Sequence, residues 1–298
     1  MKENFGVQRV TIFDVVIYAV VGLFAFVCLY PFLMVIMGSM STQASIIRNG
    51  YTLFPEEITF GAYRMLFMNF ARIAAAYRIS FIVTVSGTFL ALCVNSMIAF
   101  ALSRRDMVGR RVLSLYILIP IIFSGGMVPW YIVCVNILKI NDSLWALILP
   151  MVASSWNIFL IRNYFYSIPD SLYESAKIDG ANDFSIFFRI YLRLSTPVLA
   201  TVGLFTTLAY WNDWWHGLML VNRQELQPLQ LLLRTITSNI QFLRTMNPSP
   251  EMQVLFAQIP GPAVQMAMVV ITIGPIILVY PFVQRFFVKG IMVGSVKG

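Results

Sequence analysis

The chain has 298 residues, of which 59% are hydrophobic and only 11% charged, with a formal net charge of +8. This composition excludes a water-soluble globular domain, because a soluble domain with so many apolar residues would expose a large apolar surface to water. The basic residues lie in loops beside apolar segments, which is typical of topology signals rather than of a nucleic-acid-binding patch. We therefore expect an all-α integral membrane protein with no nucleic-acid partner and with membrane lipid around it.

Apolar stretches long enough to cross a bilayer follow one another along the chain. A transmembrane helix needs about 20 apolar residues. The first stretch is too long for the core of a cleavable signal peptide, so we expect it to remain as a helix. In the third stretch, Pro120, Pro129 and the Ser-Gly-Gly at 124–126 predict a bend or a local opening. The six predicted spans are residues 12–38, 79–102, 112–138, 144–166, 197–221 and 262–287.

Positive charge in the short links predicts the orientation of these spans. The link after the second span reads SRRDMVGRR, whereas the link after the third has Lys139 balanced by Asp142. Arginine-rich links stay in the cytoplasm, so six spans place both termini there. The predicted organisation is a cytoplasmic N-terminus at 1–11, a six-helix transmembrane domain at 12–288 and a cytoplasmic tail at 289–298.

Two loops are long enough to hold structure of their own. The outer loop, 222–261, has leucine and isoleucine at helical spacing from Leu229 to Ile240, which predicts a short amphipathic helix. The inner loop, 167–196, predicts two short helices joined by a sharp turn at Gly180. Asp170 or Ser171 begins the first helix, and Asn182 or Asp183 caps the second. Periodicity alone leaves an amphipathic connector in the lipid headgroups as an alternative.

The expected apolar faces of the two short helices are Leu172, Ala176 and Ile178 in the first, and Phe184, Phe187, Phe188, Ile190, Tyr191 and Leu194 in the second.

A motif in the inner loop resembles a known family. Glu174-Ser175-Ala176, then Gly180, then Ile190 and Leu192 at the expected spacing resemble the EAA loop of importer-type ATP-binding-cassette (ABC) permeases. ESAKIDGAND, AFALSRRDMVGRR and the tail FFVKGIMVGSVKG resemble the maltose-importer type, in the branch that handles oligosaccharides and polysaccharide fragments. The resemblance covers the whole chain. It departs from the pattern at Arg193, where a proline usually stands.

The resemblance implies a type I ABC importer permease of the bacterial inner membrane, coupled through the EAA loop to an ATPase dimer. It implies a second homologous permease in a heterodimer, an extracytoplasmic solute-binding protein and an oligosaccharide substrate, with alginate or pectin fragments among the options. The sequence has no G-x-x-x-x-G-K-[ST] loop, so we expect no catalytic residues, cofactor or metal in this chain, and ATP with Mg in the partner. The implied ATPase-coupling residues are Glu174, Ser175, Ala176, Asp179, Gly180 and Ile190, and the implied tail contacts are Lys289, Gly290, Gly294 and Lys297.

Two of these assignments have open alternatives. Asp179 is equally well explained as a local helix cap. The tail has glycines at intervals of four and two lysines, so it also fits a disordered basic end that helps to fix orientation.

The stretch YWNDWWH, residues 210–216, places polar groups at the outer end of the fifth span. A carboxylate at membrane depth costs about 2.5–3.5 kcal/mol on insertion scales, so such groups usually face the bundle interior or a water-filled cavity. In a continuous helix Trp211, Trp214 and Trp215 would share one face. Aromatic rings beside amide and carboxylate groups suit the C–H faces and hydroxyls of a sugar. The candidate path residues are Trp211, Asn212, Asp213, Trp215, Asn95 and Asn157.

Other interpretations of this stretch stay open. His216 fits an interfacial side chain, Asp213 a structural one, and the companion permease is an alternative location for most sugar contacts. Two rival classes are an intramembrane serine protease and an ion-coupled secondary carrier. The first needs a serine in a glycine-rich motif, which Ser124 lacks, and the second needs internal repeats with midplane charges.

Overall fold

A computed structural model describes residues 11–68, 70–245 and 261–275 of the chain. These residues are predominantly helical, and the β-bridge among them is an isolated one between Ser41 and Ile58. The all-α class is therefore confirmed. Contacts divide the chain into two units, residues 1–68 with 239–271 and residues 69–238 with 272–298, and each is described by itself.

The first unit begins with α1, Ile12–Ser39, which is apolar along its whole length. At 28 residues it is about 42 Å long, enough to cross a hydrocarbon core of about 30 Å. Helices α2 (Gln43–Asn49) and α3 (Gly61–Phe67) follow, and the hydroxyls of Ser39 and Tyr63 share a hydrogen bond of 2.7 Å. The apolar sides of α1 are exposed in this chain, as expected for a helix that faces lipid or a partner subunit.

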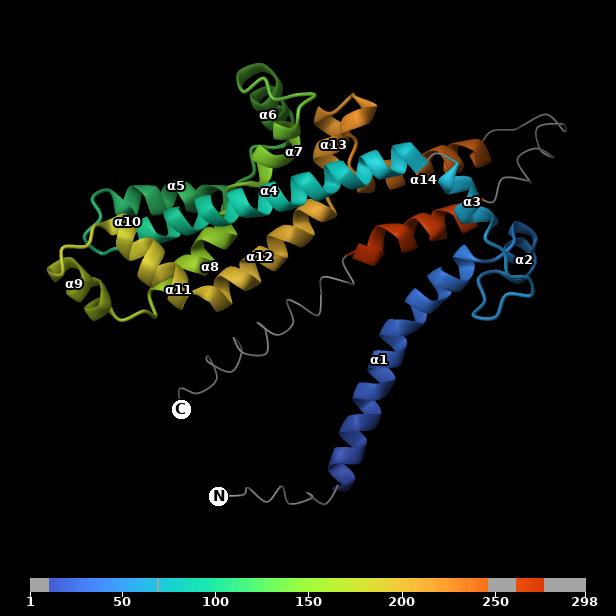
Figure 1. Ribbon diagram of the computed structural model, residues 1–298, viewed down its shortest axis with the longest axis horizontal. Helices are drawn as coiled ribbons and strands as arrows, with labels where there is room; N and C mark the ends of the chain where they lie inside the picture. The colour runs from blue at the N-terminus through green and yellow to red at the C-terminus, as the bar shows by residue number, and fades with distance from the viewer. Residues whose placement is uncertain (1–10, 69, 246–260, 276–298) are drawn as a thin grey trace. The chain divides into compact units, whose positions relative to one another are not determined.

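The second unit is built around α4, which packs along α12 and α8, while α5 contacts both α4 and α8 (Figure 1). Its elements are α4 (Phe70–Ser103), α5 (Arg110–Ile122), α6 (Met127–Ile132), the π-helical turn η1 (Val133–Ile137), α7 (Leu144–Ile148), the 3-10 turn η2 (Leu149–Met151), α8 (Ser155–Phe165), α9 (Asp170–Ile178), α10 (Asp183–Ile186), the π-helical turn η3 (Phe187–Tyr191), α11 (Leu192–Leu194), α12 (Thr196–Trp211), α13 (Trp215–Leu220), the 3-10 turn η4 (Gln224–Leu226) and the beginning of α14 (Leu229–Thr245). The rest of α14, from residue 239, belongs to the first unit.

Several predicted spans are bent rather than straight. Within the described residues, α1 and α4 alone are each long and apolar enough to cross a membrane, and up to five spans result if each bent pair is one span. The bends measure 118° between α5 and α6–η1, 49° between α7–η2 and α8, and 83° before α12. A further apolar helix covers Gly261–Pro275, the described part of the sixth predicted span. The bend predicted in the third span is confirmed, and the number of six spans stays a prediction.

Asn95 of α4 explains the break between η2 and α8. Its side chain is 1% exposed, and its amide nitrogen donates to the carbonyls of Ala91 and Val152 at 2.6 and 2.8 Å. Its amide oxygen accepts from the backbone N–H of Ser154 at 2.9 Å. Because these bonds satisfy backbone groups that a continuous helix would pair internally, the fourth span can open at this depth.

The fifth predicted span, 197–221, is not one continuous helix. Helix α12 ends at Trp211, and α13 begins at Trp215. The amide of Asn212 donates to the carbonyl of Leu208 at 2.9 Å, and Asp213 bonds to the start of α13. Asn and Asp side chains compete with helical hydrogen bonding, which is the physical reason for the break. The prediction of one shared tryptophan face was therefore wrong.

Close packing joins α4 to α12 at Gly87. A Cβ atom at Gly87 would lie 2.6 Å from the ring of Tyr210, whose hydroxyl donates to the carbonyl of Ile148 at 2.8 Å. The small residue therefore lets α12 approach α4 while Tyr210 reaches α7.

Asp142 joins two loops of the second unit, at the end where α7 and α13 lie. Its carboxylate accepts hydrogen bonds from the backbone N–H groups of Asn222 and Arg223 at 2.5 and 3.1 Å. Its own N–H donates to the carbonyl of Leu220 at 2.9 Å. The two N–H groups stabilise the charged form and hold the pKa of the Asp142 carboxyl below its usual range.

The amphipathic helix expected in the outer loop is confirmed as α14. Leu229, Leu231 and Leu232 are buried, and the backbone N–H of Leu229 donates to the hydroxyl of Ser80 at 2.8 Å. The start of α14 is thus attached to α4.

Candidate functional site

The loop between α8 and α12 forms the two short helices that its sequence predicts. Helix α9 begins after Pro169, and Gly180 has φ +80°, a left-handed conformation that favours glycine. The N–H groups of Gly180 and Ala181 donate to the carbonyls of Lys177 and Ala176 at 3.0 and 2.9 Å. This pair of bonds is a Schellman motif, so the sharp turn at Gly180 is confirmed.

The second half of the loop is capped and anchored. The side chain of Asn182 accepts from the N–H of Ser185 at 2.8 Å, so Asn182 is the cap of α10. Phe187 and Tyr191 are buried, and the Tyr191 ring lies edge-on to Phe100 of α4 at 4.8 Å between centroids. These aromatic contacts attach η3 to the end of α4. Three other apolar residues of the expected face, Phe184, Phe188 and Leu194, are exposed.

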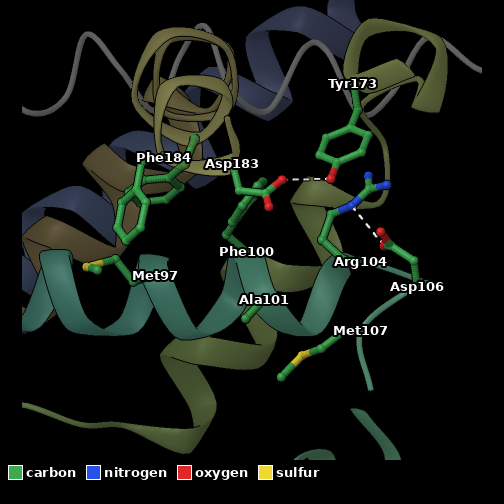
Figure 2. A pocket seen from close by; sticks show the side chains of 10 residues that line it. Met97, Phe100, Ala101, Arg104, Asp106, Met107, Tyr173, Asp183 and Phe184 are labelled. Atoms are coloured by element: carbon green, nitrogen blue, oxygen red, sulfur yellow. Dashed lines mark hydrogen bonds and ion pairs between the residues drawn. The ribbon is translucent and has the colours of Figure 1, made fainter. Parts of the chain in front are cut away.

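A second anchor ties α9 to the residue that follows α4. The guanidinium carbon of Arg104 lies 3.3 Å from the centroid of the Tyr173 ring, and the Tyr173 hydroxyl donates to Asp183 at 2.7 Å (Figure 2). The Lys177 ammonium group also reaches Asp183, at 2.9 Å. Burial, with the hydrogen bond to Asp183, raises the pKa of Tyr173. The hydrogen bond to Asp183 raises the pKa of Lys177. Tyr173 therefore stays a neutral donor and Lys177 stays charged at neutral pH.

A cavity of about 360 Å³ lies between this loop and the end of α4 (Figure 2). Arg104 and the Asp106 carboxylate form an ion pair of 3.4 Å at its wall. The lining residues are Met97, Phe100, Ala101, Arg104, Asp106, Met107, Tyr173, Asp183, Phe184 and Phe187. Contacts among these lining residues hold α9, α10 and α4 together. A displacement of α9 would therefore act on α4 directly.

The outer side of α9 presents the residues of the EAA-like motif. Glu174 and Ser175 are exposed, and the Glu174 carboxylate makes no hydrogen bond or ion pair with any residue that the structure describes. Leu172 and Ile178 are 41% and 87% exposed, whereas Ala176 packs against the core. The expected apolar face therefore turns inward only at Ala176. A helix with an unpaired carboxylate and two exposed apolar side chains is suited to contact another protein.

The remaining two coupling candidates are Asp179 and Ile190. Asp179 is the last residue before Gly180, and its N–H donates to the carbonyl of Ser175 at 3.0 Å. Its position supports the local-cap interpretation without testing a contact to another subunit. Ile190 packs against the core that contains Phe165 and Tyr191.

Residues at the break between α12 and α13 and at the start of α13 form a cluster with a tryptophan of α6. We call it the outer cluster, after the side of the membrane that the sequence predicts: Trp130, Asp213, Trp215 and His216. The Asp213 carboxylate lies 2.9 Å from Nδ1 of His216, and these side chains are 11% and 15% exposed. The rings of Trp130 and Trp215 are 4.5 Å apart between centroids. The Asp213–His216 pair satisfies both groups, so His216 has a partner that the sequence alone did not assign.

The other tryptophans of this stretch lie apart from the outer cluster. Trp211 is 8% exposed and its indole N–H donates to the carbonyl of Thr272 at 3.2 Å. The guanidinium carbon of Arg234 lies 3.7 Å from the ring centroid of Trp214. Asn212 is exposed and accepts from Gln230 at 3.2 Å.

Two further path candidates differ in their surroundings. Asn95 is buried and engaged with backbone groups, so it holds the break in the fourth span and does not face a passage of this chain. Asn157 is half-buried and donates to the hydroxyl of Thr206 at 3.3 Å. The tail candidates Lys289, Gly290, Gly294 and Lys297 lie outside the described residues.

The sequence does not predict the contact of Arg104 with Tyr173 or the contribution of Trp130. In the sequence Arg104 indicates membrane topology, and Trp130 lies 85 positions before Trp215. No local pattern joins residues so far apart, although an arginine directly after a span and a tryptophan beside a predicted bend are signals that could have been combined.

The comparisons with known proteins agree with this architecture. The sequence model of the family described as "Binding-protein-dependent transport system inner membrane component" matches residues 84–293. The chain belongs to this family. It is an inner-membrane permease of a carbohydrate ABC transporter, a transport subunit whose family keeps its ATPase in separate subunits.

Three relatives illustrate the similarity. The permease is 39% identical over 294 residues to the polygalacturonan/rhamnogalacturonan transport system permease protein YtcP of Bacillus subtilis, covering 96% of this chain and 99% of the relative. It is 37% identical to protein LplC of the same organism, covering 96% and 95%. A crystal structure of a bacterial ABC transporter involved in the import of the acidic polysaccharide alginate matches with a TM-score of 0.78 and 31% identity, covering 93% of this chain and 96% of the other. Family membership is incompatible with the protease and secondary-carrier alternatives.

Proposed function

We propose that the permease is one membrane subunit of an ATP-driven, binding-protein-dependent importer of oligosaccharides, with acidic polysaccharide fragments among its substrates. The similarity to a polygalacturonan/rhamnogalacturonan permease and to an alginate transporter supports this substrate class. It pairs with a second, homologous permease and receives sugar from an extracytoplasmic binding protein. It lies in the bacterial inner membrane with both termini in the cytoplasm.

The observation that carries the proposal is the form of the loop around Gly180. Glu174, Leu172 and Ile178 on α9 are exposed, while Tyr173 on the same helix is 7% exposed and anchored to Arg104. One side of α9 is thus free for an ATPase subunit and the other is attached to α4. A helix held in this way can pass a rigid-body movement from a docked protein to a membrane span.

In the proposed cycle, the exposed side of α9 docks on a cytoplasmic ATPase dimer that binds ATP and Mg. Glu174 pairs with a basic residue of that subunit, with Ser175, Ala176 and Asp179 at the contact. ATP binding closes the dimer and turns the paired permeases outward, and hydrolysis resets them. We propose that Gly180 and Ile190 keep the loop rigid during this movement, and that the tail at 289–298 adds a second ATPase contact.

Reconstitution tests this proposal directly. We expect the permease to co-purify with a second permease and an ATPase dimer, and vesicles with all these subunits to accumulate an oligosaccharide when ATP and the binding protein are supplied. Vesicles that contain the permease alone should not accumulate it. Accumulation by the permease alone, or purification without any ATPase, would contradict the proposal.

A further inference from the structure

The bend of the third span borders an open cavity that the proposed cycle does not use. Helix α5 ends at Ile122, residues 123–126 are non-helical, and α6 leaves at 118°. The cavity in this elbow measures about 520 Å³ and is bounded by both limbs and by Trp215 of α13. Its size is within the range of about 300–1,000 Å³ that small-molecule sites occupy. Of two other cavities, the smaller one beside Arg104, about 360 Å³, belongs to the loop described above. The larger one, about 710 Å³ between α4 and α12, is lined almost entirely by apolar atoms.

The depth of the elbow indicates what surrounds it. The 13 residues of α5 rise by about 20 Å from the cytoplasmic side that the sequence predicts, so residues 123–126 lie inside a hydrocarbon core of about 30 Å. Non-helical backbone at such depth is tolerated only where protein buries it or where it lines a water-filled cavity. Residues 123–126 are exposed within this chain. An acyl chain is therefore a poor occupant, since it cannot bond to the backbone groups of this segment.

The elbow offers hydrogen-bonding groups toward the cavity. The Ser124 hydroxyl oxygen accepts from the N–H of Gly126 at 3.3 Å, which leaves its proton available to a ligand. Gly126 has φ +84°, and a Cβ atom at Gly125 or Gly126 would meet nothing within 4 Å. The absence of side chains here leaves backbone polar groups open to a molecule in the cavity.

The opposite wall of the cavity is aromatic and held in place. Trp130 and Trp215 lie against one another with an angle of 39° between their rings, and His216 lies edge-on to both at 5.4 and 5.0 Å between centroids. The Asp213 carboxylate, 2.9 Å from Nδ1 of His216, holds the His216 ring in this position. Flat indole faces pack against the C–H faces of a pyranose, while the hydroxyl and amide groups across the cavity suit its hydroxyls.

We infer that the elbow between α5 and α6 is a saccharide-binding subsite of this permease, with Trp130 and Trp215 as the stacking wall and Ser124 as a hydroxyl contact. The inference rests on the proposed function and places part of the sugar recognition in this subunit. The substrate must pass from the outer surface inward, and the elbow lies at the middle of the predicted span 112–138, beside Trp215, one of the residues proposed for the outer path.

The test uses the complete complex with its binding protein in proteoliposomes. The probe is whichever of trigalacturonate, an alginate trisaccharide and maltotriose the binding protein binds most tightly by calorimetry. Gly125→Leu should fill the cavity without a clash, because a Cβ atom there has open space. We expect uptake to fall at least about tenfold, a change of about 1.4 kcal/mol, while ATPase activity stimulated by the binding protein stays within about twofold. The matched control is Gly22→Leu, at an equally open position on α1, which should keep normal uptake.

Each outcome of this test is decisive. Equal uptake by Gly125→Leu and Gly22→Leu overturns the inference and leaves the proposed function intact. Failure of the wild-type complex to import any of the three sugars would overturn the proposed function itself.

A milder variant keeps the inference falsifiable if Gly125→Leu does not assemble. Ser124→Ala removes one hydroxyl, so we expect KM for uptake to rise about three- to tenfold with little change in the maximal rate, the size expected for one hydrogen bond. An unchanged KM overturns the assignment of Ser124 as a hydroxyl contact. If Gly125→Leu also fails to assemble, the unchanged KM of Ser124→Ala overturns the subsite as a whole.

Discussion

Single residues set the conformation of the loops at both ends of the second unit. Gly180 and Asp142 each have a positive φ, of +80° and +52°. A Cβ atom added at Gly180 would have no other atom within 4 Å. Glycine is therefore favoured here by the backbone conformation and not by a lack of space. Asp142 is held in the same region by the backbone bonds that its carboxylate accepts. The two residues therefore respond to different kinds of substitution.

At Gly180, a β-branched residue should disturb coupling more than asparagine does. A non-glycine residue in the left-handed region costs about 1–2 kcal/mol, but asparagine tolerates it. We expect Gly180→Val to lower the amount of sugar imported per ATP several-fold, and Gly180→Asn to stay within about twofold of the wild type. The measurement is the ratio of uptake to ATP hydrolysis in proteoliposomes. Identical ratios for wild type and both variants would remove Gly180 from the coupling route.

At Asp142, stability should depend on pH in a defined direction. A carboxyl group whose pKa is lowered on folding adds stability above its unfolded pKa, and this contribution is lost as the pH falls through the folded pKa. The window therefore lies below about pH 4, the ordinary pKa of aspartate. We expect Asp142→Asn to melt at a lower temperature than wild type at pH 7, and the difference to shrink as the pH drops through this window.

The control for this experiment is Glu56→Gln, which changes an exposed carboxylate on the link between α2 and α3. Its melting temperature should differ little from that of wild type at either pH. A difference between Asp142→Asn and wild type that grows toward low pH would contradict the assigned role.

At the scale of helices, local patterns predict elements well and their interruptions poorly. The helix of α1, the bend after Pro120, the helix α14 and the turn at Gly180 follow from apolar periodicity, proline and glycine, which act over a few residues. The break at 152–154 depends on Asn95, 57 positions away from Val152, and such a contact leaves no trace in periodicity. The break after Trp211 was missed because apolar composition hid the local capping groups Asn212 and Asp213. The same limit applies to the candidate site, where the loop was predicted and its anchor on Arg104 was not.

The contact between α4 and α12 gives a prediction at this scale. At Gly87 a Cβ atom would lie 2.6 Å from Tyr210, whereas at Gly203 it would lie 3.4 Å from Leu92, an ordinary contact. We expect Gly87→Ala to destabilise the protein by about 1–3 kcal/mol through overpacking. Gly203→Ala should be neutral or stabilising, because alanine favours a helix over glycine by about 1 kcal/mol.

Thermal unfolding in one detergent compares the two glycine variants under the same conditions. Equal melting temperatures for Gly87→Ala and Gly203→Ala would contradict the close approach of α12 to α4 at Tyr210.

At the scale of the whole molecule, the permease is a transport subunit of a family whose members work with partner subunits. Large apolar side chains are exposed along α1 and on parts of α4, α5 and α6, and in a membrane they face lipid or a second permease. The connected contacts of the second unit run from α9 through Arg104 to α4, and from α4 through Tyr210 to α12. The central claim is that an ATPase moves this unit through α9.

Site-directed cross-linking at α9 tests that claim most directly. Ser175 is exposed on α9, so Ser175→Cys in a chain whose Cys28, Cys93 and Cys134 are replaced can carry a short cross-linker. The control is Asn141→Cys, an exposed position on the link predicted to lie on the opposite side of the membrane. The account predicts that Ser175→Cys captures an ATPase subunit, with a yield that changes when ATP is added, and that Asn141→Cys captures none. Intact, transport-competent complexes in which Ser175→Cys never captures an ATPase would contradict it.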